Sequence, residues 1–267
     1  IDGMRKNSPF FESNESKQLP SFTREELGLG PLLGEGSFCT VSEILAMRLD
    51  DNDDCPLEKD EKHDKNNSTN DSMEAEQQLT LLSQSPGLAR KFMNDHVLRD
   101  GQARYAIKRL RKNLSDRERM KGALDLALEA EFLMVIDHPN IIRMRGVASG
   151  DRIEGNFFLV LDRLYETLDD KIEYWKDKWK NDSGCLCFGG NKVELNQLWL
   201  ERIVVTYDLA SALRWLHSNS IIYRDIKPEN IGFDVRGDVK IFDFGLCREL
   251  RPSDRAPSND EQELYNL

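Results

Sequence analysis

The spacing of apolar residues changes along the chain and predicts a strand-rich first half followed by a mostly helical second half. Short apolar runs bounded by turn residues indicate strands. These strands are predicted at residues 27–33, 41–49, 105–110, 141–147, 157–161, 231–234 and 239–242. No segment repeats along the chain, so a repeat architecture is not expected.

Helices are predicted at residues 79–85, 88–97, 166–180 and 195–218, and a further helix is predicted to begin at Ser115. Glu118 follows Ser115 by three residues, which is the spacing of a capping box. The sequence His138-Pro139-Asn140 ends this helix, because proline disfavours helical backbone in the residue before it. Two helices carry an apolar stripe at helical spacing. The stripe of the first is Met120, Leu124, Leu128, Phe132 and Ile136, and that of the second is Leu200, Ile203, Val204, Tyr207 and Ala210.

The composition allows a sizeable core but leaves one stretch that we expect to be solvated. Of the 267 residues, 39% are hydrophobic and 32% are charged, and the formal net charge is −11. Eleven acidic residues and only three lysines lie between Asp50 and Glu76, so this stretch carries −8 of the total. Such a composition does not bury enough apolar surface to fold. We expect a disordered insertion there, and a specific acidic docking segment is the less favoured alternative.

Composition also excludes several classes of protein. No apolar run approaches the roughly 20 residues of a membrane span, and the negative charge argues against nucleic-acid partners. Five cysteines, an odd number without the spacing of a zinc site, favour a reducing compartment, the cytoplasm or the nucleus. The chain begins with Ile1 and has no leader-like segment, so we expect the start of the gene product to be missing.

Two motifs in the first half are candidates for phosphate contacts. Gly34-Glu35-Gly36-Ser37-Phe38-Cys39-Thr40-Val41 joins two predicted strands, and glycines let a backbone approach a phosphate closely. A plain hairpin turn is the alternative for this motif alone. Tyr105-Ala106-Ile107-Lys108 ends in a lysine that would neutralise phosphate charge if Glu129 or Glu131 of the next helix held it. An edge-strand lysine in solvent is the alternative here.

The third motif is more specific. Tyr223-Arg224-Asp225-Ile226-Lys227-Pro228-Glu229-Asn230 is followed by Asp243-Phe244-Gly245. Asn230 and Asp243 offer hard oxygen ligands for Mg²⁺. Asp225 is then left to accept a hydroxyl proton, and Lys227 to neutralise a phosphoryl group in transfer. The set as a whole predicts phosphotransfer chemistry.

With these motifs the chain resembles the protein kinase family, specifically its serine/threonine branch. The resemblance runs from about Phe22 to the C-terminus and is interrupted by an acidic insertion at 50–100, which we expect to be disordered. It implies an α+β, two-lobe protein kinase fold: an N-terminal extension (1–21), a β-rich N-lobe with one key helix (22–161) and a partial helical C-lobe (162–267). It also implies ATP and Mg²⁺ as cofactors and transfer of the γ-phosphate to serine or threonine of a protein substrate.

The resemblance assigns a role to each site residue. Lys108 contacts the α- and β-phosphates and is held by Glu129, with Glu131 as the less favoured partner. Leu161 is at the gatekeeper position, and the backbone of Asp162 and Leu164 binds the adenine edge. Asp225 is the catalytic base, assisted by Lys227, and the metal ligands are Asn230 and Asp243. The remaining ATP-binding residues are Gly34, Glu35, Gly36, Val41 and Ala106.

Three residues depart from the family pattern without removing a reacting group. Tyr223 replaces the commoner histidine, Cys39 replaces the third glycine, and Gly232 replaces a bulky residue that supports the adenine. Arg224 is expected to grip a phosphate on the activation segment. That role implies an upstream activating kinase as a partner, and the candidate phosphorylation sites are Ser253, Ser258 and Tyr265.

The ending of the chain leaves the function open between alternatives. Only 22 residues follow Gly245, without an Ala-Pro-Glu sequence or later helices, so we expect a fragment cut within the activation segment. The later helices of the family would cover the helix at 195–218, so without them we expect an apolar face of this helix to be exposed. A catalytically incompetent nucleotide-binding or interaction fragment is therefore the main alternative to an active enzyme. A small-molecule kinase is less favoured, because such kinases share the Asp-to-Asn spacing but lack the Lys-Pro-Glu context.

Overall fold

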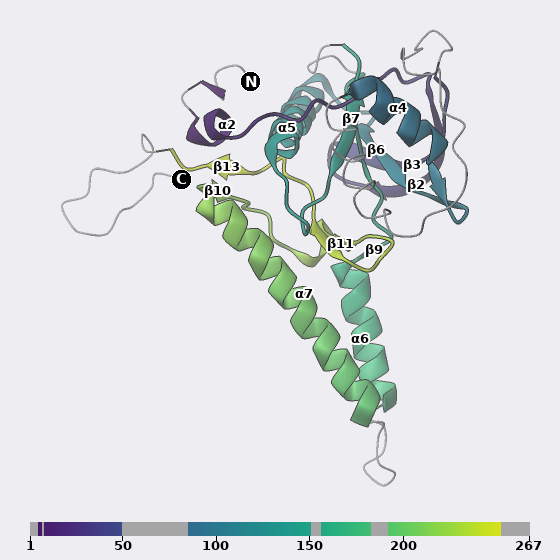
Figure 1. Ribbon diagram of the computed structural model, residues 1–267, viewed down its shortest axis with the longest axis vertical. Coiled ribbons are helices and arrows are strands. Elements are labelled where there is room, and N and C mark those ends of the chain that lie inside the picture. The colour runs from purple at the N-terminus through teal and green to yellow at the C-terminus, as the bar shows by residue number, and fades with distance from the viewer. Residues whose placement is uncertain (1–4, 7, 50–84, 151–155, 183–191, 252–267) are drawn as a thin grey trace, which may run out of the picture. The chain divides into compact units, whose positions relative to one another are not determined.

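The computed structural model describes residues 5–6, 8–49, 85–150, 156–182 and 192–251 (Figure 1). The chain divides into two compact units. The sheet unit comprises Ser16–Leu126 and Met144–Asp162, and the helical unit comprises Ile1–Glu15, Ala127–Arg143 and Arg163–Leu267. The acidic stretch, the helix predicted at 79–85 and the candidate sites Ser253, Ser258 and Tyr265 lie outside the described residues.

A six-stranded sheet with the order β1-β7-β8-β6-β3-β2 forms the framework of the sheet unit. β1 runs parallel to β7, and the other neighbours are antiparallel. The strands are β1 (Ser21–Phe22), β2 (Leu27–Glu35), β3 (Cys39–Met47), β6 (Tyr105–Leu110), β7 (Met144–Ala148) and β8 (Phe158–Asp162). The strands predicted in this half are confirmed, whereas the short strand β1 was not predicted.

Apolar side chains of the central strands form the core of the sheet unit. Ile44 of β3, Ile107 of β6 and Leu159 of β8 are fully buried. Phe22 of β1 is also fully buried, and its ring lies where a Cβ on Gly146 of β7 would come within 2.7 Å. The absence of a side chain at position 146 therefore makes room for Phe22 beside β7.

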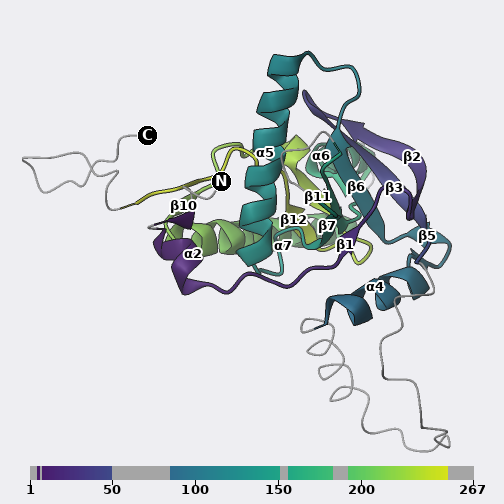
Figure 2. The ribbon, with the colours of Figure 1, turned by 90° about the horizontal axis from the view of Figure 1, so that it is seen from above.

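Part of the expected insertion has regular structure. The helix α4 (Pro86–Asp95) is capped by Ser85, whose side chain accepts a hydrogen bond from the Leu88 N–H, and Pro86 occupies the first turn. Met93 is buried, and Figure 2 shows α4 next to the hairpin of β4 (Leu98–Arg99) and β5 (Gln102–Ala103). The helix predicted at 88–97 is therefore confirmed, and the expected disordered insertion does not extend over residues 86–100.

The helix α5 (Asp116–Val135) has the start and end that the sequence predicts. The Ser115 N–H donates to Glu118 Oε2 at 2.9 Å, and Ser115 Oγ accepts from the Glu118 N–H at 3.4 Å, which completes the capping box. Beyond the helix, Asn140 Nδ2 donates to the Val239 carbonyl at 3.1 Å. This bond fixes the end of α5 to the strands of the helical unit.

The predicted apolar stripe of α5 is correct only near the C-terminal end. Phe132 is fully buried, but Met120 is 70% exposed and Leu124 is also exposed. Leu126 and Ala130 are buried instead. The first turns are too rich in charged residues for apolar spacing to select a single inner face, so the stripe prediction was wrong there.

The helical unit contains two long helices that lie side by side in Figure 1, α6 (Leu168–Asp182) and α7 (Lys192–Ser218). A three-stranded sheet joins β12 (Val239–Ile241), β11 (Ile231–Phe233) and β9 (Glu166–Thr167), and β10 (Ile221–Ile222) pairs with β13 (Arg248–Glu249). Two short elements complete the unit, the helix α2 (Pro9–Ser13) and the 3-10 turn η1 (Pro228–Asn230). The helices α6 and α7 share a core with β11 and β12, which includes Trp175, Leu198, Val205, Ile231, Phe233 and Val239.

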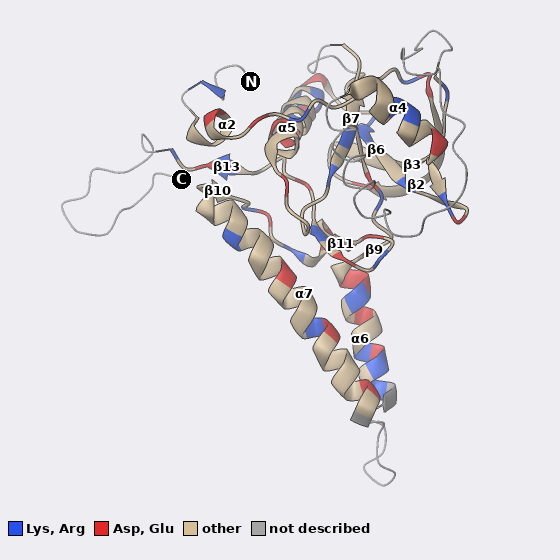
Figure 3. Ribbon diagram, in the orientation of Figure 1, with Lys and Arg blue, Asp and Glu red and all other residues tan. Residues whose placement is uncertain are grey.

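The helix α7 is apolar on more than one face. Figure 3 shows few charged residues along α7, whereas α6 carries many charges of both signs. Leu198, Val205 and Leu216 are buried, and most of the predicted stripe is exposed: Leu200, Ile203, Val204 and Tyr207. The helix therefore presents an apolar face that the described residues do not cover, as the sequence led us to expect.

These elements confirm an α+β fold, with strands concentrated in the sheet unit and long helices in the helical unit. Within the described ranges, no helix combines the length and the apolar character that a membrane crossing requires.

Replacing Gly146 with alanine is expected to lower the free energy of unfolding by about 1–3 kcal/mol, the usual cost of overpacking. The new Cβ would lie 2.9 Å from the Pro20 carbonyl oxygen, and backbone cannot move aside as a flexible side chain can. Gly87→Ala in α4 is the control, because no atom lies within 4 Å of its Cβ position. It should raise stability by about 0.5 kcal/mol. Equal effects of the two substitutions on urea unfolding would contradict this packing argument.

Candidate active site

The turn between β10 and β11 brings together three of the predicted site residues. Lys227 is extended, as the residue before a proline prefers, and Pro228 begins the turn η1. The Asn230 N–H donates to the Lys227 carbonyl at 3.0 Å and closes the turn. Asp225 Oδ2 accepts from Lys227 Nζ at 2.8 Å and from Asn230 Nδ2 at 2.6 Å. The predicted base, its lysine and a predicted metal ligand therefore form one hydrogen-bonded cluster.

Asn230 connects this cluster to Asp243. Its side chain is 5% exposed, and Nδ2 also donates to the backbone carbonyl of Asp225 at 3.0 Å. Its own carbonyl accepts from the Phe242 N–H at 3.0 Å. Phe242 directly precedes Asp243, whose φ of 67° is in the left-handed region that favours glycine. The two predicted metal ligands are thus held through one backbone bond, with the amide oxygen Oδ1 of Asn230 left for other contacts.

The charges within the cluster shift the pKa values of both partners. The hydrogen bond from Lys227 lowers the pKa of Asp225, and the bond from Asn230 adds to this effect. The same carboxylate raises the pKa of Lys227. At neutral pH the pair is therefore a carboxylate and an ammonium ion.

Tyr223 has a structural role that the sequence did not reveal. Its hydroxyl donates to the Phe242 carbonyl, and its ring packs edge-on against Phe244 with centroids 5.2 Å apart. Burial raises the pKa of Tyr223, and nearby carboxylates add to the shift, so the phenol stays protonated and keeps donating. The only signal in the sequence was a hydrogen-bonding side chain directly before Arg224-Asp225.

Arg224 contacts the backbone that follows Asp243-Phe244-Gly245. Its φ is 68°, and its Nε donates to the Leu246 carbonyl at 2.6 Å. Its expected phosphate partner lies outside the described residues and stays a prediction.

Glu129 and Glu131 have different surroundings. Glu129 is 1% exposed, and its charge contributes to the raised pKa values of Tyr223 and of the buried Cys247 thiol. Glu129 therefore faces the strands and loops that carry Asp225 and Asp243. Glu131, the less favoured partner of Lys108, forms an ion pair with Arg5. Lys108 and Glu129 belong to different units, and the ion pair between them stays a prediction.

The register of the sheet places four predicted nucleotide-binding residues on one face. Val41 of β3 is opposite Lys108 of β6, and Ala106 of β6 is opposite Leu161 of β8. Directly opposed residues share a face, and so do residues two apart in a strand. The next residue, Asp162, is held by two hydrogen bonds from Arg145, at 2.7 and 2.9 Å. No pattern in the sequence indicated this ion pair.

The glycine-rich turn between β2 and β3 is held from outside by one arginine. The Gly36 N–H donates to the Cys39 carbonyl at 2.8 Å. Arg111 forms an ion pair with Glu35 at 2.7 Å and a long hydrogen bond to the Gly36 carbonyl at 3.4 Å. A Cβ at Gly34 would meet no atom within 4 Å, so the packing of the sheet unit does not require that glycine.

Leu164 explains why a glycine stands at position 232. A Cβ on Gly232 would come within 2.9 Å of Leu164 Cδ1 and 3.1 Å of the Glu166 carbonyl oxygen. The side chain of Leu164 therefore occupies the space that a bulkier residue on β11 would fill. At this position, the side chain of Leu164 therefore stands beside β11 in place of a side chain on residue 232.

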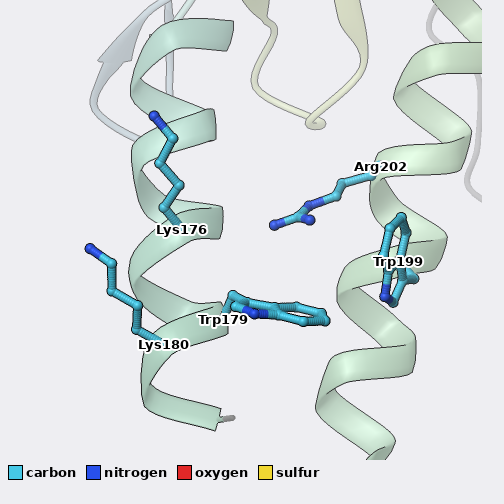
Figure 4. A pocket seen from close by; sticks show the side chains of 5 residues that line it. All are labelled: Lys176, Trp179, Lys180, Trp199 and Arg202. Carbon is cyan, nitrogen blue, oxygen red and sulfur yellow. The ribbon is translucent and has the colours of Figure 1, made fainter. Parts of the chain in front are cut away.

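A cavity of about 290 Å³ lies between α6 and α7, lined by Lys176, Trp179, Lys180, Trp199 and Arg202 (Figure 4). Arg202 points from α7 toward Trp179, and its guanidinium lies 5.5–6.0 Å from the rings of Trp175, Trp179 and Trp199. The ammonium groups of Lys176 and Lys180 point away from Arg202 (Figure 4). No predicted site residue lines this cavity, and we assign it to the packing of the helix pair.

Replacing Lys227 with methionine is expected to raise the pKa of Asp225 toward its ordinary value, because Lys227 is the main cause of the lowering. In the wild type, the lowered pKa contributes stability that is present above the ordinary carboxyl pKa. That stability is lost as the pH falls through the lowered value. Carbon-detected NMR titration of the Asp225 carboxyl measures the change. Lys180→Met, which removes an exposed ion pair on α6, should leave this titration unchanged. The same pKa in both variants would argue against the Asp225–Lys227 contact.

Gly232→Ala is expected to destabilise the chain by about 1–3 kcal/mol, because the new Cβ crowds Leu164. Leu164→Ala removes one of the crowding atoms, so the double variant should lose less stability than the two single variants together. The difference, a coupling of about 0.5–1 kcal/mol, is measured in a double-mutant cycle of urea unfolding. Additive effects would mean that Leu164 does not fill the space beside Gly232.

Comparisons with known proteins agree with this geometry. Residues 93–265, more than half of the chain, match the family model of the protein kinase domain. A probable serine/threonine-protein kinase, MARK-C, of Dictyostelium discoideum is 30% identical over 51% of this chain and 15% of its own length. A second relative, from Arabidopsis thaliana, is the leaf rust 10 disease-resistance locus receptor-like protein kinase-like 1.4. It is 35% identical over 60% of this chain and 21% of its own length. Human ribosomal protein S6 kinase alpha-2 is 32% identical over 57% of this chain and 17% of its own.

The chain thus spans about a fifth or less of the length of these relatives. The family match covers the capped helix α5, the Asp225–Asn230 turn and Asp243-Phe244-Gly245. On this match and the geometry of the turn, the chain belongs to the protein kinase domain family.

Proposed function

We propose that the chain takes part in transfer of the γ-phosphate of ATP to serine or threonine of a protein substrate. The observation that carries this proposal is the cluster in which Lys227 and Asn230 both donate to one oxygen of Asp225. The names of two relatives, a probable serine/threonine-protein kinase and a ribosomal protein S6 kinase, support a protein as the acceptor. The Lys227-Pro228-Glu229 context supports the serine/threonine branch.

In this proposal Asp225 positions the attacking hydroxyl and accepts its proton. Oδ2 already accepts two hydrogen bonds, which leaves Oδ1 for the substrate hydroxyl. A carboxylate with a lowered pKa is a weak base, so it suits a loose transition state in which the hydroxyl loses its proton late. Lys227 keeps its charge and offsets the negative charge of the phosphoryl group.

Asn230 and Asp243 are the residues that would hold Mg²⁺, the ion that protein kinases use with ATP. The donor set fits, because carboxylate and amide oxygens are the ligands that this ion prefers. Asn230 Nδ2 is engaged by Asp225, which leaves the amide oxygen as its ligand atom. When bound, the ion supplies positive charge to the phosphate oxygens. The protein contributes by holding the two ligands through the Phe242–Asn230 backbone bond.

The sheet unit supplies the proposed nucleotide contacts. Val41, Ala106, Lys108 and Leu161 share one face, and no atom lies within 4 Å of the Cβ position of Gly34. Lys108 binds the phosphates in this proposal, and Glu129 holds it in place. The other proposed contacts are Glu35 and Gly36 in the turn and the backbone of Asp162 and Leu164.

The first test is thermal unfolding of the full chain with and without Mg·ATP. At 100 times Kd, the nucleotide should add about 2.7 kcal/mol to the stability of the wild type. Lys108→Met and Asp243→Asn should reduce this gain, because each removes a charge from the proposed phosphate or metal contacts. The matched control is Asp177→Asn, which changes an exposed carboxylate on α6 and should keep the full gain.

The second test is phosphorylation of serine- and threonine-containing peptides. Asp225→Asn should keep the stabilisation by Mg·ATP but lower the rate by about 10²- to 10⁴-fold, the usual contribution of a positioned acid or base. If the wild type gains stability from Mg·ATP but transfers no phosphate, the alternative of a nucleotide-binding fragment is favoured. If Mg·ATP adds no stability, the proposal is wrong for this chain.

A further inference from the structure

The N-terminal segment Ser8–Ser13, which we call the N-terminal clamp, is tied into the helical unit by buried contacts. It consists of α2 and its cap, where Ser8 Oγ accepts a hydrogen bond from the Phe11 N–H at 3.1 Å. Ser8 is fully buried and Phe10 is 3% exposed. The clamp lies outside residues 93–265, the range that matches the protein kinase domain. The match to the family therefore does not account for the contacts of the clamp.

One side of the N-terminal clamp packs against the helix that carries Glu129. The rings of Phe10 and Phe11 have centroids 6.2 and 5.7 Å from that of Phe132, which lies three residues beyond Glu129 on α5. Phe10 also meets Trp215 of α7 edge-on, with centroids 6.4 Å apart. Just before the clamp, Arg5 forms its ion pair with Glu131. The N-terminal segment therefore contacts the last turns of α5 at two neighbouring residues, Glu131 and Phe132.

The other side of the N-terminal clamp binds the strand that follows Asp243. The Phe10 N–H donates to Glu249 Oε1 at 2.9 Å in a buried hydrogen bond. Glu249 lies on β13, six residues beyond Asp243, and is opposite Ile221 of β10, the strand that leads to Tyr223 and Asp225. A buried polar side chain without a hydrogen-bond partner is costly, so this contact holds β13 beside the clamp.

From these contacts we infer that the N-terminal clamp is a positioning element for phosphotransfer. It joins the helix that bears Glu129 to the strand that follows Asp243. The inference rests on the proposed function, because it assigns the clamp no chemistry of its own. Phe10 is its central residue, since its ring contacts α5 and α7 while its backbone N–H binds β13. Loss of the ring should loosen both attached segments together and leave the reacting groups in place.

The test compares four variants of the full chain with the wild type by amide hydrogen exchange and by peptide phosphorylation. Phe10→Ala removes the ring, and Phe10→Leu keeps most of the apolar volume. Ser8→Ala removes only the cap of α2, so it loosens the clamp if Phe10→Ala does not fold. Phe92→Ala is the matched control, because Phe92 stacks on His96 in α4 of the sheet unit.

In Phe10→Ala we expect at least about tenfold faster exchange in residues 127–135 and 246–250, with no change in β6 and β8. Phosphorylation at saturating Mg·ATP should fall at least threefold, and Phe10→Leu should restore most of both signals. Ser8→Ala should give the same pattern with a smaller amplitude, and Phe92→Ala should give neither change.

Three results would overturn the inference. The first is unchanged exchange in both segments of Phe10→Ala, or of Ser8→Ala if the other variant does not fold. The second is faster exchange throughout the chain, which indicates general destabilisation. The third is the same loss of activity in Phe92→Ala. Absence of phosphorylation in the wild type would instead count against the proposed function, and the exchange data would still decide whether the clamp holds the two segments.

Discussion

The side chain of Asn230 holds together the turn on which the proposed chemistry depends. Its Nδ2 donates to both the backbone carbonyl and the carboxylate of Asp225, and the backbone carbonyl of Asn230 accepts from the Phe242 N–H, next to Asp243. A buried polar group that loses its partners costs about 1–3 kcal/mol, so these bonds favour a single arrangement of the turn. The position of Asp225 relative to Asp243 therefore depends on these hydrogen bonds, together with the packing of β11 and β12 on the long helices.

Electrostatics around this turn follow from the same arrangement. Burial is the main cause of the raised pKa of Tyr223, and the nearby groups Cys247, Asp243, Asp225 and Glu129 add to it. Like charges gathered in this way repel one another and need cations nearby. Lys227 supplies one of these charges by its hydrogen bond to Asp225. In the proposed function, Mg²⁺ would add further positive charge at Asn230 and Asp243.

Two of the departures from the family pattern, Tyr223 and Gly232, each make a local contact near the site. Tyr223 stands where histidine is commoner, and its hydroxyl binds the Phe242 carbonyl, just before Asp243. Gly232 lacks a side chain, and Leu164 fills the adjacent space. Both contacts join residues that are distant in the sequence but close in the helical unit.

The sequence by itself determined the fold class, most strands, the capped start of α5 and the candidate residues of the site. These features depend on local patterns: alternating apolar residues, a capping box, a proline after Lys227, and the spacing from Asp225 to Asp243. It did not determine which face of α7 is buried, because a helix that is apolar on several sides has no periodic signal to choose between them.

Only the tertiary structure decided the contacts between distant segments. It joined Arg145 to Asp162, Leu164 to Gly232, and Phe10 to Glu249. The physical reason is that such contacts depend on how the elements pack in space. The identity of a residue at one position does not indicate which residue of another element it will contact. The motifs behind the proposed chemistry are therefore visible in the order of the residues, while the contacts that hold them in place came only from the fold.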